Sequence, residues 1–242
     1  MMFCALPQSV SAQNQNLGLP KVALDITKAD SPKDFSVTLQ VVIMMTILTI
    51  APSILMMATC FTRIIVVFHF LKQALGTQTQ PPAQVLAGLA MFLTFFVMSP
   101  VFNDANSNGL QPYLREEISQ SQAIDNMIKP FRAFMMKQVR QEDLALFLKL
   151  QNAEKPATPD DISILTLVPA YTLSELRVGF QIGFVIFIPF LVIDMIISSI
   201  LMSLGMMLLP PQLISLPVKI LLFILVDGWN LIVSSLMNSI LK

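Results

Sequence analysis

The chain has 242 residues, of which 55% are hydrophobic and 12% are charged, and its 15 basic side chains balance 15 acidic ones. An ordinary soluble domain carries about 25% charged residues. Half that proportion excludes a disordered protein, a basic nucleic-acid-binding domain and an ordinary soluble enzyme, and it indicates an integral membrane protein. Because the net charge is zero, no nucleic acid is expected as a partner.

Residues 1–34 predict a signal-peptide-like leader followed by a polar linker. The triplet Val10-Ser11-Ala12 before Gln13 matches the small-residue pattern that precedes a signal-peptidase site. Residues 1–7 are short for an apolar signal core and include no basic side chain, so a disordered tail stays open as the alternative. Residues 13–34 are polar, and we expect them to form an exposed linker.

Residues 35–103 predict a first hydrophobic hairpin. No charge occurs from Phe35 to Thr62, which is long enough for a membrane-spanning helix. Pro52 lies inside this run, so we expect a kink or break there. The pair Pro81-Pro82 predicts the turn of the hairpin, and the second apolar helix covers Val85–Phe102.

Residues 104–161 differ in composition, because they hold sixteen of the thirty charged residues. Apolar side chains recur there at helical spacing, which predicts amphipathic helices in a small insert between the two hairpins. The insert carries a net charge of minus two, whereas Arg63 and Lys72 flank the turn of the first hairpin. Basic residues favour the cytoplasmic side, so we expect the insert to be extracytoplasmic, on the periplasmic side.

Residues 162–242 predict a connecting helix and a second hydrophobic hairpin. Its apolar stretches are Val178–Leu204, with an expected break at Pro189, and Leu213–Leu241. The connection between them is short and uncharged, which predicts an antiparallel hairpin. The expected fold is therefore an all-α integral membrane protein, in which two hairpins with about four hydrophobic helices flank a small extracytoplasmic helical insert.

The sequence offers little for catalysis. It lacks a glycine-rich phosphate loop, a paired-cysteine metal motif and a serine nucleophile elbow. His69 is the only histidine, and the two cysteines are Cys4 in the leader and Cys60 in an apolar run. We therefore expect no enzyme activity, no metal site and no cofactor, and we expect the Cys60 thiol to be buried and inert.

Three charged residues lie inside the apolar stretches of the second hairpin, namely Asp194, Lys219 and Asp227. Charges at membrane depth are costly, and they normally face protein or water. Asp194 and Lys219 are almost equidistant from the turn, so we predict an ion pair, either within the hairpin or across a subunit boundary. Structural pairing and a proton or ion relay both stay open, and Asp227 predicts either a kink or a helix contact.

The turn Gly205–Pro211 is unusual, because Met206, Met207, Leu208 and Leu209 make it apolar. Flexible methionines suit a site that seals around variable shapes, and rings of apolar side chains close pores by excluding water. A pore seal and a buried turn in an oligomer are both consistent with this segment.

Several segments carry a family resemblance. They are Met57–Ile64, Gln78–Pro82, Pro169–Leu176, Gly183–Phe184 with Pro189–Asp194, Gly205–Pro211 and Leu216–Lys219. Together they resemble the FliP/SctR family of type III secretion export-gate proteins, and in particular its flagellar members. The similarity extends from about residue 35 to the C-terminus and includes the order of hairpin, insert and hairpin.

The resemblance implies a core subunit of the flagellar protein export gate in the bacterial inner membrane, within the basal body. It implies a homo-oligomer, expected to be a pentamer, that assembles with FliQ and FliR beside FlhA, FlhB and the MS ring and passes unfolded flagellar proteins. The resemblance implies a pore gasket of Met206, Met207 and Leu208. From the residues we add the charge pairs Asp194–Lys219 and Glu175–Arg177, with a solvated helix end as the open alternative for Glu175 and Arg177. The loop or hinge positions are Gly205, Pro189, Pro210 and Pro211.

Two other functions stay open from the residues alone. A small secondary transporter would use the charged residues at midplane depth and the proline-broken helices. An injectisome export-gate homologue would share the same segments with the flagellar protein. The missing internal repeat and the apolar turn count against the transporter.

Overall fold

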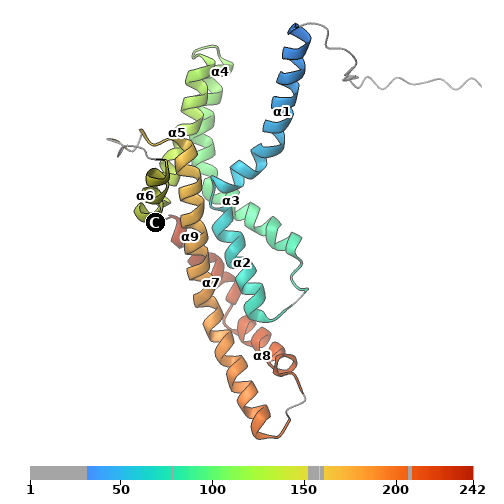
Figure 1. Ribbon diagram of the computed structural model, residues 1–242. Coiled ribbons are helices and arrows are strands. Elements are labelled where there is room, and N and C mark those ends of the chain that lie inside the picture. The colour runs from blue at the N-terminus through green and yellow to red at the C-terminus, as the bar shows by residue number, and fades with distance from the viewer. Residues whose placement is uncertain (1–31, 78, 152–157, 159–160, 207–208, 242) are drawn as a thin grey trace, which may run out of the picture. The chain divides into compact units, whose positions relative to one another are not determined.

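The computed structural model describes residues 32–77, 79–151, 158, 161–206 and 209–241, with side chains from residue 39 onward (Figure 1). The chain divides into two units, which end and begin at Leu48 and Thr49. The described part of the first unit is one stretch of helix, the beginning of α1 (Pro32–Met57). Its apolar side chains from Leu39 onward are largely exposed, as expected of a helix that needs lipid or another protein around it.

The sequence predicted a kink or a break at Pro52; α1 is not broken there and continues to Met57. Residues 58–60 then interrupt the helical structure, and α2 (Phe61–Leu75) follows. The hydroxyl of Thr59 donates to the carbonyl of Met56 and accepts from the N–H of Phe61, at 3.2 and 3.5 Å. Threonine side chains that bond nearby backbone compete with the helical ladder, which gives the break a physical reason.

The end of α2 and the start of α3 (Ala83–Ala105) form the turn predicted at the proline pair. Gly76 ends α2 in the left-handed conformation, with φ +74°, and Pro82 is the N-cap of α3. The apolar run of α3 continues through a π-helical segment, Asn106–Leu110, into the short helix α4 (Gln111–Leu114). The first apolar hairpin thus leads directly into the polar insert.

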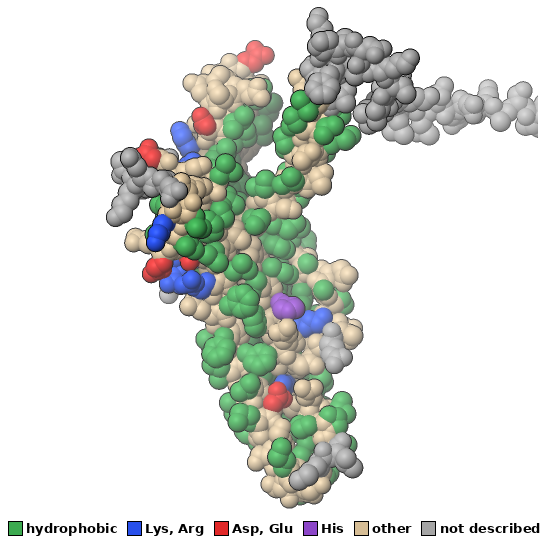
Figure 2. All heavy atoms as spheres, viewed as in Figure 1, with side chains coloured by type: hydrophobic (Ala, Val, Ile, Leu, Met, Phe, Trp, Pro, Cys, Tyr) green, Lys and Arg blue, Asp and Glu red, His purple; other side chains and the backbone are tan. Residues whose placement is uncertain are grey.

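The insert consists mainly of α5 (Gln120–Gln138) and α6 (Gln141–Leu150). A capping box starts α5, because the Ser119 hydroxyl accepts from the N–H of Gln122 and the Gln122 side chain accepts from the N–H of Ser119. Basic and acidic side chains gather over these helices, whereas the visible surface over α7 and α8 is mostly apolar (Figure 2).

Helix α7 (Ile164–Ser203) is 40 residues long and runs from the insert to the connection before α8 (Figure 1). The expected break at Pro189 is absent, because α7 continues through both Pro169 and Pro189. Proline interrupts the backbone ladder, but Phe190 is buried and its ring lies 6.4 Å from that of Phe223. Packing against a neighbouring helix thus holds α7 together at this position.

The second arm of the second hairpin consists of two helices. Helix α8 (Pro211–Leu225) and α9 (Gly228–Leu241) are bent by 65° at Val226–Asp227. Asp227 has φ +49°, and Gly228 lies so close to the Phe223 ring that an added Cβ would approach it to 2.3 Å. Aspartate tolerates left-handed backbone better than most residues, and only glycine fits against this ring.

The predicted fold class is confirmed. The described residues are helical and contain no strand, and three helices are long and apolar enough to cross a membrane. Counting the bent pair α8–α9 as one span raises the number to four. The main core of the second unit lies where α2 meets α3, α7 and α9, with Ile64, Phe68, Met98 and Leu236 fully buried. This core holds the polar groups described next.

Candidate functional site

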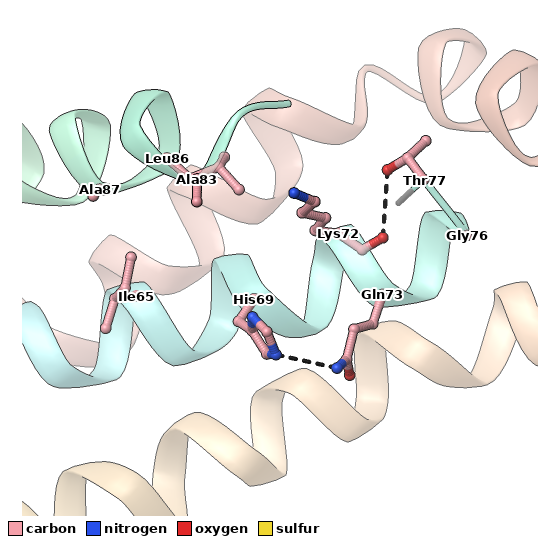
Figure 3. A pocket seen from close by; sticks show the side chains of 9 residues that line it. All are labelled: Ile65, His69, Lys72, Gln73, Gly76, Thr77, Ala83, Leu86 and Ala87. Carbon is pink, nitrogen blue, oxygen red and sulfur yellow. Dashed lines mark hydrogen bonds between the residues drawn. The ribbon is translucent and has the colours of Figure 1, made fainter. Parts of the chain in front are cut away.

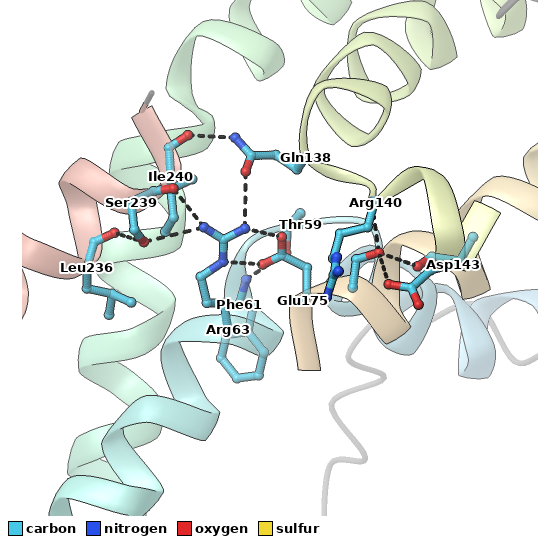
Figure 4. A network of polar contacts seen from close by, with 12 residues as sticks. Thr59, Phe61, Arg63, Gln138, Arg140, Asp143, Glu175, Leu236, Ser239 and Ile240 are labelled. Atoms are coloured by element: carbon cyan, nitrogen blue, oxygen red, sulfur yellow. Dashed lines mark hydrogen bonds and ion pairs between the residues drawn. The ribbon is translucent and has the colours of Figure 1, made fainter. Parts of the chain in front are cut away.

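The most buried ion pair among the described residues joins Arg63 of α2 to Glu175 of α7 (Figure 4). Arg63 Nε lies 2.8 Å from Glu175 Oε2, and Arg63 Nη2 lies 2.5 Å from Oε1. The two side chains are 3% and 1% exposed. Two parallel N–H···O bonds between a guanidinium and a carboxylate are strong and directional, so this contact fixes α2 against α7.

The remaining donors of Arg63 reach the C-terminal ends of α5 and α9. Arg63 Nη1 donates to the carbonyl of Ser239 at 2.9 Å, and Nη2 donates to Gln138 Oε1 at 3.1 Å. Gln138 in turn donates to the carbonyl of Ile240 at 2.7 Å. A cation at the last carbonyls of a helix also favours the helix dipole. One arginine therefore ties α2, α5, α7 and α9 together.

A second polar group attaches α6 to the same part of α7. Asp143 is 2% exposed and accepts from the Ser174 hydroxyl at 2.8 Å. Arg177 Nη2 lies 3.3 Å from the other Asp143 oxygen, and the N–H of Arg140 donates to Ser174 at 3.1 Å. The insert and the second hairpin are thus joined by buried hydrogen bonds as well as by apolar contacts.

Glu175 and Arg177 are not paired with each other, in contrast to the sequence-based expectation. Glu175 binds Arg63, and Arg177 binds Asp143. Residues two apart on a helix point to different sides, so these two side chains cannot meet on α7. Sequence reasoning missed Arg63 and Asp143, although Arg63 ends a long uncharged run and its partner had to come from elsewhere in the fold.

The structure brings Asp194 of α7 and Lys219 of α8 together. Lys219 Nζ lies 2.5 Å from Asp194 Oδ2, and it also donates to the carbonyl of Ala74 in α2 at 3.2 Å. The lysine side chain is 6% exposed and the aspartate side chain 35%. Asp194 Oδ1 is buried without a hydrogen-bond partner among the described atoms. The contact joins α2, α7 and α8, but it leaves one acceptor open.

The apolar turn is described only in part. Gly205 ends α7 with φ +74°, its N–H donates to the carbonyl of Met202, and the N–H of Met206 donates to that of Leu201. This is the hydrogen-bond pattern of a glycine C-cap. Met206 is 38% exposed, whereas Met207 and Leu208 lie outside the described residues. Pro210 is the N-cap of α8 and Pro211 is its first residue.

His69 and Lys72 line a hollow of about 680 Å³ between α2 and α3 (Figure 3). His69 Nε2 lies 3.1 Å from the side-chain nitrogen of Gln73, and the other walls include Ala83, Leu86 and Ala87. Among the described residues that line this hollow there is no serine, cysteine or carboxylate. Within the described residues, no three histidine, cysteine or acidic side chains gather as metal ligands.

The arrangement is therefore one of apolar helices joined by buried ion pairs, with a glycine-capped apolar turn at one end. The sequence profile of the FliP family matches residues 44–236, which include α2 to α8 and both ion pairs. The chain belongs to the FliP family. The sequence resemblance to this family is thereby confirmed.

Curated relatives of the FliP family agree over most of the chain. The flagellar biosynthetic protein FliP of Bacillus subtilis is 50% identical over 216 residues, which are 89% of this chain and 98% of the relative. The protein of the same name from Pectobacterium carotovorum is 48% identical and covers 86% of this chain and 80% of the relative. That of Aquifex aeolicus is 45% identical, with coverages of 84% and 85%.

Proposed function

We propose that this chain is a core subunit of the flagellar type III protein export gate, a membrane channel that passes unfolded flagellar proteins. The observation that carries the proposal is the FliP-family match across residues 44–236, together with relatives that are named as flagellar biosynthetic proteins. The subunit acts without covalent chemistry, by forming and sealing a passage.

The exposed apolar surface supports assembly with other proteins. In the three candidate spans, 0%, 28% and 11% of the most apolar window is buried within the chain itself. Helices that expose so much apolar surface need lipid or other subunits around them. The family resemblance supplies the partners of the proposal, which are further copies of this chain, FliQ and FliR, with FlhA, FlhB and the MS ring close by.

In the proposed setting the gate lies in the bacterial inner membrane, within the flagellar basal body. The insert, α5 and α6, then lies on the periplasmic side, because the basic Lys72 lies near the turn of the first hairpin while the insert is net acidic. The contacts of Gln138 with Arg63 and Ile240 and of Asp143 with Ser174 and Arg177 hold the insert against the second hairpin.

The seal of the closed channel is assigned to the turn after α7. Gly205 ends α7 sharply, and the Asp194–Lys219 contact fixes α8 against α7 on the way to the turn. The turn is therefore anchored on both sides. Met206, Met207 and Leu208 would form the gasket, and an entering substrate would displace the flexible thioether chains, which reseal behind it.

The gasket is tested by ion leakage through the assembled complex in liposomes. The Met206→Ala, Met207→Ala double variant should raise leakage of a small cation severalfold, because shorter side chains no longer meet across the passage. The matched control is the Met195→Ala, Met202→Ala double variant, since both of these methionines are 65% exposed but lie on α7 outside the turn. Equal leakage of an assembled gasket variant and its control would contradict the gasket.

The function itself is tested separately, by deleting the gene and measuring export of flagellar proteins into the medium. Loss of export, and its return with the intact chain, supports the proposal. Purification in detergent adds a second measurement. A complex of several copies with small membrane proteins supports the gate, whereas a lone monomer in a strain with intact export would contradict it.

A further inference from the structure

Two charged side chains in the apolar helices have no ion partner within the described chain. From Phe61 to Asn103 and from Ile164 to Leu241 the sequence holds seven formal charges. Five of them are engaged in the ion pairs of Arg63, Arg177 and Lys219 with Glu175, Asp143 and Asp194, of which Asp143 comes from the insert. The two that remain are Lys72 of α2 and Asp227 of the α8–α9 bend, one basic and one acidic.

Both side chains lie on surfaces that have to be covered. Asp227 is exposed, and its neighbours Leu225 and Val226 are 74% and 53% exposed. Lys72 is half-buried at the edge of the hollow shown in Figure 3, where the α3 walls are Ala83, Leu86 and Ala87. An isolated charge on an apolar surface is costly once lipid or protein covers it, unless the covering molecule supplies an opposite charge.

The two charges lie at similar heights along the bundle. The rings of Phe68 in α2 and Trp229 in α9 are 6.4 Å apart, which places the start of α9 beside Phe68. Lys72 is one helical turn from Phe68, about 6 Å along α2, and Asp227 is two residues from Trp229. In a ring of subunits whose axis runs along the bundle, only groups at similar heights can meet between neighbours.

The two charges also belong to different surfaces of the second unit. Lys72 borders the hollow between α2 and α3, whereas Asp227 lies between Val226 and Gly228, which line a groove of about 620 Å³ against α7. The apolar walls of this groove include Val185 and Pro189, and the two hollows share no residue. Different surfaces with opposite charges are what a head-to-tail contact between identical subunits requires, and such contacts build rings or helical assemblies.

We propose that copies of this chain meet head to tail, with Asp227 of one copy paired to Lys72 of the next. The α8–α9 groove of the first copy then covers the α2–α3 corner of the second. This inference rests on the proposed function, because it names the contact by which the export-gate subunits form their ring. The charge pair sets the vertical register between neighbours, and the surrounding apolar side chains supply the contact area.

The test uses a membrane-permeant carbodiimide, which joins a lysine amine to a carboxylate only when the two are in contact. In membranes that contain the assembled complex, the native chain should give a ladder of covalent multimers. The linked peptide, identified by mass spectrometry, should contain Lys72 and Asp227. Lys72→Arg is the matched control, since it keeps the positive charge but cannot be coupled, and it should assemble normally without a ladder.

A mixed experiment separates contacts between copies from contacts within one chain. A tagged Lys72→Arg copy is expressed together with an untagged Asp227→Asn copy, so neither chain can couple to itself. Head-to-tail pairing predicts a covalent dimer that contains one tagged and one untagged chain, and nothing larger. Asp227→Asn alone, which keeps a side chain suited to left-handed backbone, should lower the assembled fraction about tenfold.

An assembled, exporting complex without the Lys72–Asp227 link overturns this inference and leaves the proposed function intact. Coupling of Lys72 or Asp227 to a different protein overturns it as well, because the occupant of the groove is then not a second copy. Failure of the proposed function has a different signature, namely intact flagellar export in cells that lack the chain.

Discussion

Two ion pairs of the described chain, Arg63–Glu175 and Lys219–Asp194, differ in how completely their atoms are bonded. Arg63 and Glu175 are 3% and 1% exposed, and the arginine also bonds Gln138 and Ser239. Lys219 and Asp194 are 6% and 35% exposed, with one further bond to a backbone carbonyl and one unpartnered carboxylate oxygen. Every nitrogen of the Arg63 guanidinium thus has a hydrogen-bond partner, whereas one oxygen of the Asp194 carboxylate has none among the described atoms.

The difference separates a permanent joint from a site that can take another partner. A fully bonded buried pair has nothing to offer a second molecule, and it repays its desolvation only because every donor is satisfied. The Asp194 side chain is 35% exposed, so a neighbouring subunit can still approach this pair, whereas Arg63 and Glu175 are out of reach. We therefore expect the Arg63 network to govern folding of the subunit and the Asp194–Lys219 pair to govern the second hairpin and its assembly.

The largest expected effect comes from Arg63→Ala, which leaves the carboxylate of Glu175 buried without its partner. Loss of one member of a buried pair costs about 3–5 kcal/mol, so the detergent-solubilised subunit should unfold at a much lower temperature or denaturant concentration. Arg177→Ala is the matched control, because this arginine also pairs with a buried carboxylate but is itself 46% exposed. It should cost clearly less.

Replacement of both partners sharpens the first prediction. The double variant Arg63→Met, Glu175→Leu removes both charges together, so it should regain part of the stability that Arg63→Ala loses. Equal unfolding midpoints for Arg63→Ala and Arg177→Ala would show that the network is not the joint that we describe. The comparison between the two ion pairs would then no longer hold.

A smaller effect is expected from Lys219→Met, which leaves Asp194 without its ion partner. The aspartate side chain is 35% exposed, so water replaces part of the lost contact, and we expect about 1–3 kcal/mol. A double-mutant cycle with Asp194→Asn measures the coupling between the two residues. A coupling energy near zero, or a loss as large as that of Arg63→Ala, would remove the distinction between the two pairs.

What the sequence predicted well depended on residues that are close along the chain. Asp194 and Lys219 flank one short turn, so their equal distance from it sufficed to suggest a contact. Arg63 and Glu175 are 112 residues apart, and no local pattern relates them. The break expected at Pro189 is absent, and at Pro52, where a kink or a break was expected, no break forms. The reason is similar, because proline weakens a helix locally while packing from other elements decides whether it breaks.

The smallest effect concerns Cys60, which lies between α1 and α2 outside the candidate spans and is fully buried beside the Arg63 network. Burial, followed by the negative charge of Glu175, raises the pKa of its thiol from 9.0 to about 12. Such a rise lowers the thiolate fraction at neutral pH about thousandfold, and the thiolate is the reactive form. In a Cys4→Ser background, iodoacetamide should therefore leave the folded chain almost unlabelled.

The same thiol reports on the comparison between the two ion pairs. Arg63→Ala should expose Cys60 and speed its labelling strongly, because this substitution disrupts the packing around the network. Lys219→Met should leave the labelling rate nearly unchanged, since its contacts join α8 to α7 and to the far end of α2. Equal acceleration by both substitutions would mean that the two pairs belong to one cooperative unit. The region around Asp194 and Lys219 would then not open separately from the region around Arg63 and Glu175.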